Sequence, residues 1–186
     1  MKLWLLRHAR VLLPPGLCYG ASDVPADDVL TAEAAQAIAP LLPAGLPVRV
    51  SDLARAQQLH RVLHAKRPDL GAASTDPRLR EMDFGTWEQT AWDAVPRAAF
   101  DAWMADFALH RFGGAECVQD LMNRVADALD DTRSAVGAGG EALWITHAGV
   151  IRSVVYLARH GRRPIASARE WPRDAPETGG WTVLEL

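Results

Sequence analysis

The sequence has few cysteines, no long apolar run and no excess of basic residues. Cys18 and Cys117 are the only cysteines among 186 residues, too few for a disulfide framework, so we expect a reduced, cytoplasmic setting. The longest apolar runs are far short of the ~20 residues needed to cross a bilayer. The segment 1–10 lacks the long apolar core and cleavage site of a signal peptide, so we expect no membrane association and no secretion signal.

The charge balance is close to even. A net charge of −3 argues against a general nucleic-acid binder, whose binding face is usually basic. Hydrophobic residues make up 49% and charged residues 23% of the chain, as in ordinary globular proteins. This length supports one sizeable core, so a single domain over 1–186 is expected. The oligomeric state cannot be derived from these features.

Apolar runs alternate with segments of helical periodicity. Strands are predicted at 2–6, 47–50, 72–76, 141–146 and 181–186. Helices are predicted from an N-cap at Thr31 to about Pro40, and at 52–66, 116–134 and 149–160. This alternation is typical of a three-layer α/β/α fold with a mostly parallel sheet. The segment 81–112, rich in Trp, Phe and Asp, is predicted to be a small helical cap.

Two predicted strands run directly into a histidine. The strand KLWLL precedes Arg7 and His8, and the strand ALWIT precedes His147 at the start of a helix. Ligands of parallel α/β sheets bind at the carboxyl ends of the strands. A helix N-terminus at the same edge also favours an anion.

A third strand adds an arginine to the same edge. The strand PVRV is followed by Ser51 and by a helix that carries Arg55 about one turn in. Arginine binds phosphate oxygens with two parallel donors, and histidine can act as a nucleophile or a donor. Two arginines and two histidines at one sheet edge therefore predict a phosphate site.

The chain resembles the histidine phosphatase superfamily, which includes the phosphoglycerate mutases. Five segments resemble that family's motifs in the family's order: LLRHA at 5–9, SDLARAQQ at 51–58, LREMDFGTWE at 79–88, GGAECVQDLMNRV at 113–125 and WITHAGVIR at 144–152. They cover most of the chain. The departures, such as Ala9 in place of the family's glycine, remove no catalytic group.

The resemblance implies a role for each matched residue. His8 corresponds to the nucleophile, Arg7 and Arg55 to the arginines that hold the phosphate, and His147 to the second histidine. Glu81 corresponds to the acid that protonates the leaving group. The same resemblance implies no metal and no cofactor.

Further substrate-binding residues are expected around this centre. They are Tyr19 and Gly20 in the loop 17–26, Ala148 after the second histidine, and Arg10, which adds a cation. Within the family the loop CYGASDVP and the compact length look most like alpha-ribazole phosphatases of cobalamin synthesis. Phe84, Trp87 and Trp92 either stack on a flat substrate ring or pack the core of the cap.

The expected function is a metal-independent phosphomonoesterase that forms a phosphohistidine and hydrolyses alpha-ribazole 5′-phosphate. Alternatives are a phosphoglycerate mutase, a small-molecule phosphatase of broad specificity, and a catalytically silent module that binds phosphate or protein. The expected partner is a small phosphate monoester.

Overall fold

The computed structural model describes residues 1–186 and contains one five-stranded sheet. The strands lie in the order β3-β2-β4-β1-β5. Their bounds are β1 Lys2–Arg7, β2 Val48–Val50, β3 Ser74–Thr75, β4 Glu141–Thr146 and β5 Trp181–Glu185. The first four strands are parallel, and β5 pairs antiparallel with β1 at the sheet edge.

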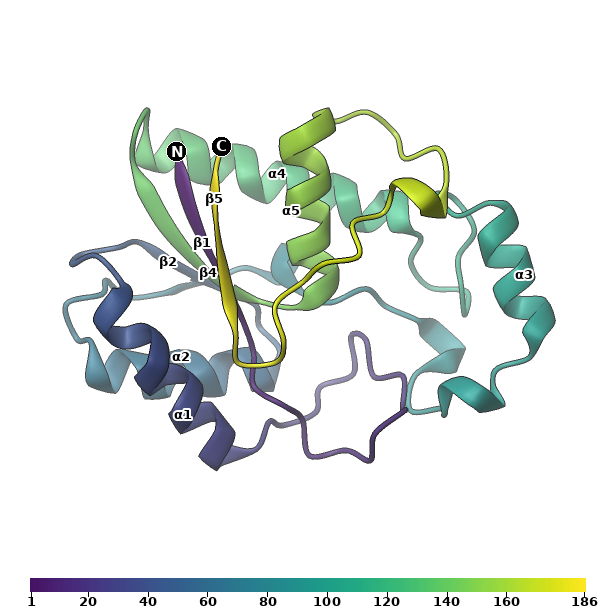
Figure 1. Ribbon diagram of the computed structural model, residues 1–186, viewed down its shortest axis with the longest axis horizontal. Coiled ribbons are helices and arrows are strands. Elements are labelled where there is room, and N and C mark those ends of the chain that lie inside the picture. Colours follow the sequence, from purple (N-terminus) through teal and green to yellow (C-terminus); the bar gives the residue numbers. More distant parts are fainter.

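Helices cover both faces of the sheet, which confirms the predicted three-layer α/β/α fold (Figure 1). The α-helices are α1 Asp28–Ile38, α2 Ala54–Lys66, α3 Arg97–Ala105, α4 Val118–Val136 and α5 Ala148–His160. Helices α1 and α2 pack on one face, and α4 and α5 pack on the other. Short 3-10 helices are η1 Ala39–Leu41, η2 Pro77–Leu79, η3 Gly85–Trp87, η4 Trp92–Ala94 and η5 Ala168–Glu170. No helix has the length and apolar character required to span a membrane.

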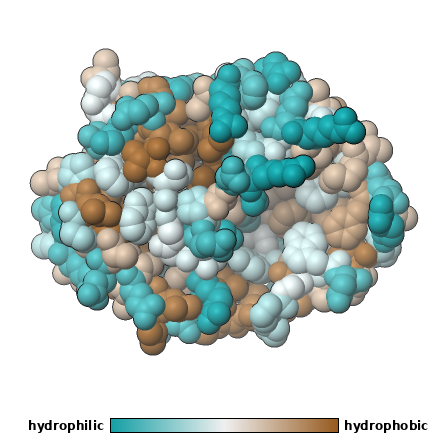
Figure 2. All heavy atoms as spheres, in the orientation of Figure 1, coloured by the Kyte–Doolittle hydropathy of each residue, from teal (hydrophilic) through white to brown (hydrophobic).

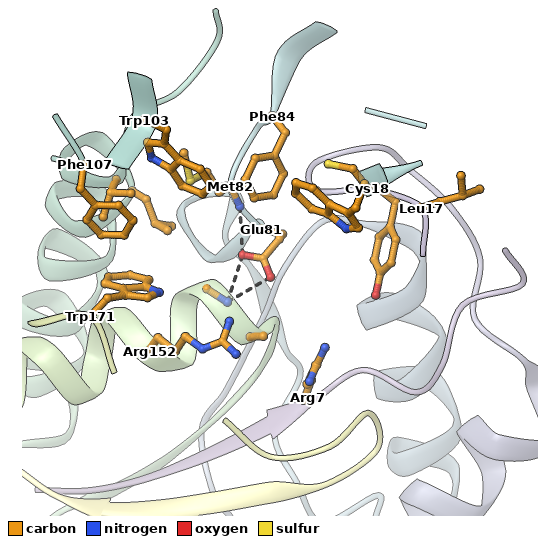
Figure 3. Close-up of a pocket in the computed structure, with 17 residues that line it drawn as sticks. Arg7, Leu17, Cys18, Glu81, Met82, Phe84, Trp103, Phe107, Arg152 and Trp171 are labelled. Atoms are coloured by element: carbon orange, nitrogen blue, oxygen red, sulfur yellow. Dashed lines mark hydrogen bonds between the residues drawn. The ribbon is translucent and has the colours of Figure 1, made fainter. Parts of the chain in front are cut away.

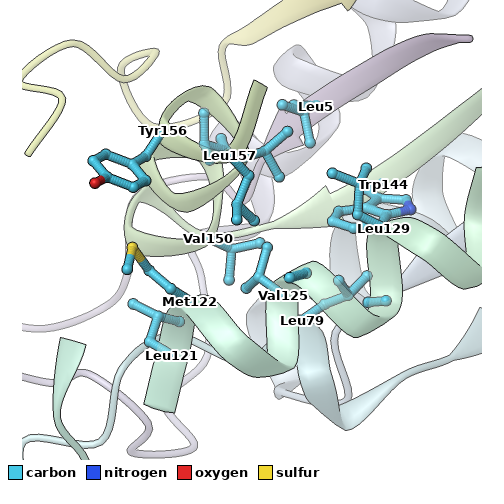
Figure 4. Close-up of a cluster of buried hydrophobic side chains, with 14 of the residues drawn as sticks. Leu5, Leu79, Leu121, Met122, Val125, Leu129, Trp144, Val150, Tyr156 and Leu157 are labelled. Atoms are coloured by element: carbon cyan, nitrogen blue, oxygen red, sulfur yellow. The ribbon is translucent and has the colours of Figure 1, made fainter. Parts of the chain in front are cut away.

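Alternation along the central strands divides the apolar residues between two cores. Leu3 and Leu5 of β1 face α4 and α5, whereas Trp4 and Leu6 face α1 and α2. In the core beneath α4 and α5 (Figure 4), the buried Trp144 of β4 donates its indole N–H to Thr132 Oγ1 at 3.2 Å. Burial on both faces explains why these strands have unbroken apolar runs.

The cap predicted at 81–112 is built from η3, η4 and α3, and it extends to one side of the sheet (Figure 1). Its rings gather around the buried Phe112: the ring centroids of Trp103 and Phe100 lie 4.5 and 5.2 Å from it. On the molecular face seen in Figure 2, polar and charged side chains surround smaller apolar patches.

The predicted start of the first helix is wrong by four residues. Asp27 is the N-cap of α1, and its Oδ1 accepts the N–H of Leu30 at 3.0 Å. Thr31 lies inside the helix and donates its hydroxyl to the carbonyl oxygen of Asp27 at 2.6 Å. The α2 helix also begins later than predicted, at Ala54, so Arg55 lies in its first turn.

Candidate active site

His8 follows β1 directly and is almost fully buried, with 2% of its surface exposed. Its backbone N–H donates to the carbonyl oxygen of Thr146 in the neighbouring strand, at 3.1 Å. The ring Nδ1 lies 2.7 Å from the carbonyl oxygen of Ala9. A carbonyl can only accept a hydrogen bond, so we assign the ring proton to Nδ1. Nε2 then has a free lone pair, as a nucleophile requires.

His147 lies beside His8 because β4 pairs in register with β1, with Thr146 opposite Arg7. The two imidazole centroids are 5.0 Å apart, and the His147 ring is fully buried. Its Nε2 lies 2.8 Å from the hydroxyl of Ser51, which follows β2. Three adjacent strands therefore contribute a polar side chain at the same sheet edge.

Burial and nearby cations keep both histidines neutral. Desolvation, followed by the positive charge of Arg55, lowers the pKa of His8 to about 3 from the ordinary 6.5. The same two causes hold the pKa of His147 well below 6.5. Both rings therefore offer an uncharged nitrogen at neutral pH.

Two arginines reach the same place without a carboxylate partner. Arg55 is completely buried and donates to the carbonyl oxygens of Ser22 and Gly20, at 2.7 and 2.6 Å. Arg7 donates Nη1 to the carbonyl oxygen of Pro176 at 2.9 Å. In both residues Nε is buried without a hydrogen-bond partner. Neither guanidinium has a carboxylate within the 4.0 Å of an ion pair, which suits both cations to an anionic ligand.

Glu81 is fixed against the first turn of α5. Both carboxylate oxygens accept the N–H of Gly149, at 3.1 and 3.0 Å, and Oε1 also accepts the N–H of Met82 at 3.0 Å. The helix that begins after His147 thus holds the carboxylate predicted to be the acid.

Arg124 of α4 holds the chain segment before and at Glu81. It donates to the carbonyl oxygens of Arg78 and Arg80, each at 2.7 Å, and to that of Glu81 at 3.1 Å. The Glu116 carboxylate keeps the guanidinium in place through two hydrogen bonds of 2.6 and 3.0 Å. These contacts fix where the Glu81 backbone lies.

Glu88 performs a similar role for the loop that binds Arg55. Its carboxylate accepts the N–H of Ala21 at 2.7 Å and of Phe84 at 3.0 Å, and the hydroxyl of Ser22. This places the carbonyl groups on either side of Ala21 at the Arg55 guanidinium. The arginine is therefore oriented by the cap.

A pocket of about 360 Å³ adjoins these groups (Figure 3). Arg7, Tyr19, Gly20, Glu81 and Ala148 are part of its wall. His8, Arg55 and His147 are buried and do not line the pocket, but each adjoins a residue of its wall. His8 follows Arg7, His147 precedes Ala148, and Arg55 donates to the carbonyl oxygen of Gly20. Most of the remaining wall is apolar and comes from the cap and from Trp171.

The structure brings most of the predicted site residues together but separates two of them. Arg10 is exposed and lines a different surface hollow with Glu33 and Thr178. Trp87 packs near Phe112, at 6.0 Å between centroids, and does not line the pocket. Phe84 and Trp92 both line the pocket and pack against one another, at 5.5 Å.

Sequence reasoning assigned no role to Ser51, Glu88, Arg124 or Arg152. All four lie within the segments that resemble the family's motifs, but no function was predicted for them. Arg124 borders the apolar face of α4 but is not part of it. A charged residue in such a position usually contacts solvent. The only signal was the segment that contains it, GGAECVQDLMNRV.

Comparison with known proteins gives a family and several similar folds. The family described as histidine phosphatase superfamily (branch 1) matches residues 3–186. A structure of phosphoglycerate mutase from Thermus thermophilus has 27% identity and a TM-score of 0.71, and the alignment covers 100% of this chain and 93% of that one. No curated protein matches the sequence.

Two mycobacterial structures show the same fold at lower identity. Mycobacterial glucosyl-3-phosphoglycerate phosphatase has 22% identity and a TM-score of 0.78, with coverage of 98% of this chain and 88% of that one. A mycobacterial hydrolase has 22% identity and a TM-score of 0.80, with coverage of 98% and 89%. The family match spans nearly the whole chain and all five motif segments. This chain belongs to the histidine phosphatase superfamily, whose members are phosphatases and mutases.

Proposed function

We propose that the protein is a metal-independent phosphomonoesterase that forms a phosphohistidine at His8. One observation supports this above all. A neutral His8, protonated on Nδ1, lies beside Arg7 and Arg55, and neither arginine has a carboxylate partner. A nucleophilic nitrogen next to two cations is the arrangement that phosphoryl transfer needs.

In the first step, His8 Nε2 attacks the phosphorus of the monoester. The new N–P bond forms as the bond from phosphorus to the ester oxygen breaks. Arg7 and Arg55 stabilise the charge on the non-bridging oxygens. Protonated Glu81 donates its proton to the departing oxygen, so an alcohol leaves instead of an alkoxide.

His147 supplies a neutral donor in this step. The Ser51 hydroxyl accepts the N–H of Leu53 at 3.3 Å, and we assign its own proton to the hydrogen bond with His147 Nε2. The proton of His147 then resides on Nδ1, which is buried and has no partner in the protein. That N–H donates to a phosphate oxygen.

In the second step, water attacks the phosphohistidine. The Glu81 carboxylate, which lost its proton in the first step, removes a proton from the water. The N–P bond breaks, inorganic phosphate leaves, and Glu81 and His8 return to their starting states. Each turnover consumes one ester and one water molecule.

The sequence resemblance of the loop 17–26 makes alpha-ribazole 5′-phosphate the first candidate substrate. The apolar wall of the pocket supports it, because Phe84 and Trp92 offer faces for a flat base. A sugar-containing phosphoglycerate ester is an alternative, since one similar structure is a glucosyl-3-phosphoglycerate phosphatase. A mutase is the second candidate reaction, because a phosphoglycerate mutase is similar over the whole chain.

The test is hydrolysis of p-nitrophenyl phosphate in the presence of EDTA. We expect turnover to persist with EDTA and to fall at least ~1,000-fold in His8→Asn. His160→Asn, which alters an exposed histidine at the end of α5, serves as the matched control and retains activity. Loss of turnover with EDTA contradicts the metal-free mechanism, and phosphate binding without turnover indicates a silent binding module.

Substrate choice is tested with a panel of natural monoesters. Alpha-ribazole 5′-phosphate, glucosyl-3-phosphoglycerate and 3-phosphoglycerate are compared by kcat/KM for phosphate release. Best hydrolysis of the first supports the resemblance of the loop 17–26, and best hydrolysis of a phosphoglycerate ester supports the alternative. Formation of 2-phosphoglycerate that depends on 2,3-bisphosphoglycerate identifies a mutase instead.

A further inference from the structure

Arg152 is a third arginine at the pocket, and the phosphoryl-transfer steps do not use it. It lies in the second turn of α5, five residues after His147, and its side chain is part of the pocket wall. Figure 3 shows its guanidinium between Trp171 and Arg7, on the side of the pocket below Glu81. It therefore lies on the side of the phosphate site that faces the apolar wall.

The hydrogen-bonding capacity of Arg152 is largely unused. Its Nε is buried without a partner, and its Nη2 makes one long contact of 3.3 Å to the carbonyl oxygen of Arg173. Ten other arginines of the chain pair with a carboxylate within 4.0 Å, but Arg152 does not. A partly buried guanidinium without an acid is costly unless a ligand supplies the counter-charge.

The charges in the pocket indicate what that ligand carries. A phosphate dianion is balanced by Arg7 and Arg55, and Glu81 must be protonated to act as the acid. Arg152 then remains as an unbalanced cation beside an apolar wall that includes Phe107 and Trp171. A second anionic group on the leaving group satisfies it with two parallel hydrogen bonds.

We propose that Arg152 determines specificity by binding an anionic group, a carboxylate or a second phosphoryl group, on the leaving group of the substrate. This inference rests on the proposed phosphomonoesterase function. The substrate class is a phosphate monoester whose alcohol portion carries a second negative charge a few bonds from the ester oxygen. A phosphoglycerate ester belongs to this class, whereas alpha-ribazole 5′-phosphate, whose alcohol portion is uncharged, does not, so the inference favours the phosphoglycerate esters of the substrate panel. Its apolar or ring portion lies against Phe107 and Trp171.

The experiment compares aryl phosphates that differ only in charge. Wild-type kcat/KM is measured for 3- and 4-carboxyphenyl phosphate and for the neutral carboxamides of the same shape. A parallel pair, 4-phosphonophenyl phosphate and its uncharged diester, distinguishes a phosphoryl group from a carboxylate. We expect at least one anionic ester to exceed its neutral partner by about tenfold or more, mainly through a lower KM.

The variants assign this preference to one side chain. In Arg152→Gln, the ratio of kcat/KM for an anionic ester to kcat/KM for its neutral partner is expected to fall to about one. Arg152→Lys is expected to keep part of this preference. Arg159→Gln removes an exposed charge from the last turn of the same helix and is expected to leave the ratio unchanged. Thermal unfolding of each variant verifies that it is folded.

The outcomes separate the two proposals. Hydrolysis with no preference for any anionic ester, or with the preference intact in Arg152→Gln, overturns the role of Arg152 and leaves the phosphatase function standing. If wild type hydrolyses none of the esters, or if His8→Asn is as active as wild type, the proposed function falls, and the role of Arg152 falls with it.

Discussion

Both carboxylate oxygens of Glu81 accept the same backbone N–H, that of Gly149 in the first turn of α5. A methyl group at Gly149 would collide with Glu81 Oε1, although the helical backbone there accepts any residue. A glycine at position 149 is therefore needed for the Glu81 carboxylate to approach the first turn of α5. The position of Glu81 and the start of the helix after His147 depend on one another.

We expect Gly149→Ala to impair the protonation of the leaving group. The added methyl group displaces the Glu81 carboxylate, so it protonates the leaving group less well. Poor leaving groups are affected most, because they depend most on protonation by the acid. The loss in kcat/KM should be about tenfold or more for an alkyl phosphate and smaller for p-nitrophenyl phosphate, whose leaving group needs little protonation. Glu81→Gln should show the same pattern, and Gly71→Ala, at a glycine with open space around it, should show neither effect. Equal losses on both substrates would contradict this role.

The hydrogen bond between Ser51 and His147 leads to a second expectation. Without the hydroxyl, the proton of His147 is no longer directed to Nδ1, and the ring loses its orientation. Ser51→Ala should lower kcat about tenfold with a smaller change in unfolding temperature. Ser134→Ala, at an exposed serine of α4, is the control. An unchanged kcat in Ser51→Ala would exclude the hydroxyl as a positioning group.

The adjacent glycines Gly113 and Gly114 differ in how closely they approach the backbone of Phe84. Gly113 and Gly114 both have positive φ, of +84° and +90°. A Cβ at Gly113 would collide with the carbonyl oxygen of Phe84, whereas nothing lies within 4 Å of one at Gly114. Gly114→Ala should therefore cost only the backbone strain, about 1–2 kcal/mol.

Gly113→Ala should lower the free energy of unfolding by the same backbone strain, about 1–2 kcal/mol, plus the cost of moving the backbone away from Phe84. Urea unfolding of the two variants measures the difference. Equal losses would show that the close packing of Gly113 on Phe84 contributes nothing.

The buried neutral histidines make stability depend on pH. The unfolded chain binds protons at His8 and His147 below pH ~6.5, whereas burial in the folded protein lowers the pKa of His8 to about 3 and that of His147 well below 6.5. The contribution of these residues to stability is complete above pH ~6.5 and is lost as the pH falls toward 3. Each adds a slope of up to about 1.4 kcal/mol per pH unit.

Urea unfolding at several values between pH 7 and pH 5, in buffers without phosphate or sulfate, measures this slope. Between pH 7 and pH 5, the free energy of unfolding should fall less in His8→Gln than in wild type. The difference should reach about 2 kcal/mol at pH 5. His60, whose pKa is also lowered by burial, is present in both proteins and cancels in the comparison. Parallel curves for the two proteins would contradict the lowered pKa of His8.

Much of the fold could be predicted because its signals are local. The strand β4 has the predicted bounds, since an apolar run buried on both faces is unmistakable in sequence. The start of α1 was missed because Asp27 and Thr31 are both good N-caps, and only the bond from Leu30 N–H decides between them. The direction of β5 was not evident, because alternation shows which residues face the core but not the direction of the strand.

The site was predictable to the extent that it follows from strand ends. Arg7, His8 and His147 meet because β1 and β4 are neighbours in a parallel sheet. Arg124 could not be found this way, because its partners are carbonyl oxygens more than forty positions earlier in the chain. Arg10 was expected beside the substrate, but the chain turns after Ala9 and places it next to α1.

The central claim is that His8 carries the phosphoryl group. The direct measurement is mass spectrometry of peptides, kept at alkaline pH, after brief exposure of Glu81→Gln to p-nitrophenyl phosphate. Loss of the base slows hydrolysis of the intermediate, so we expect a phosphoryl group on the peptide that contains His8, labile in acid and absent from His8→Asn. Turnover with no such adduct, or with the phosphoryl group on another residue, would contradict the mechanism.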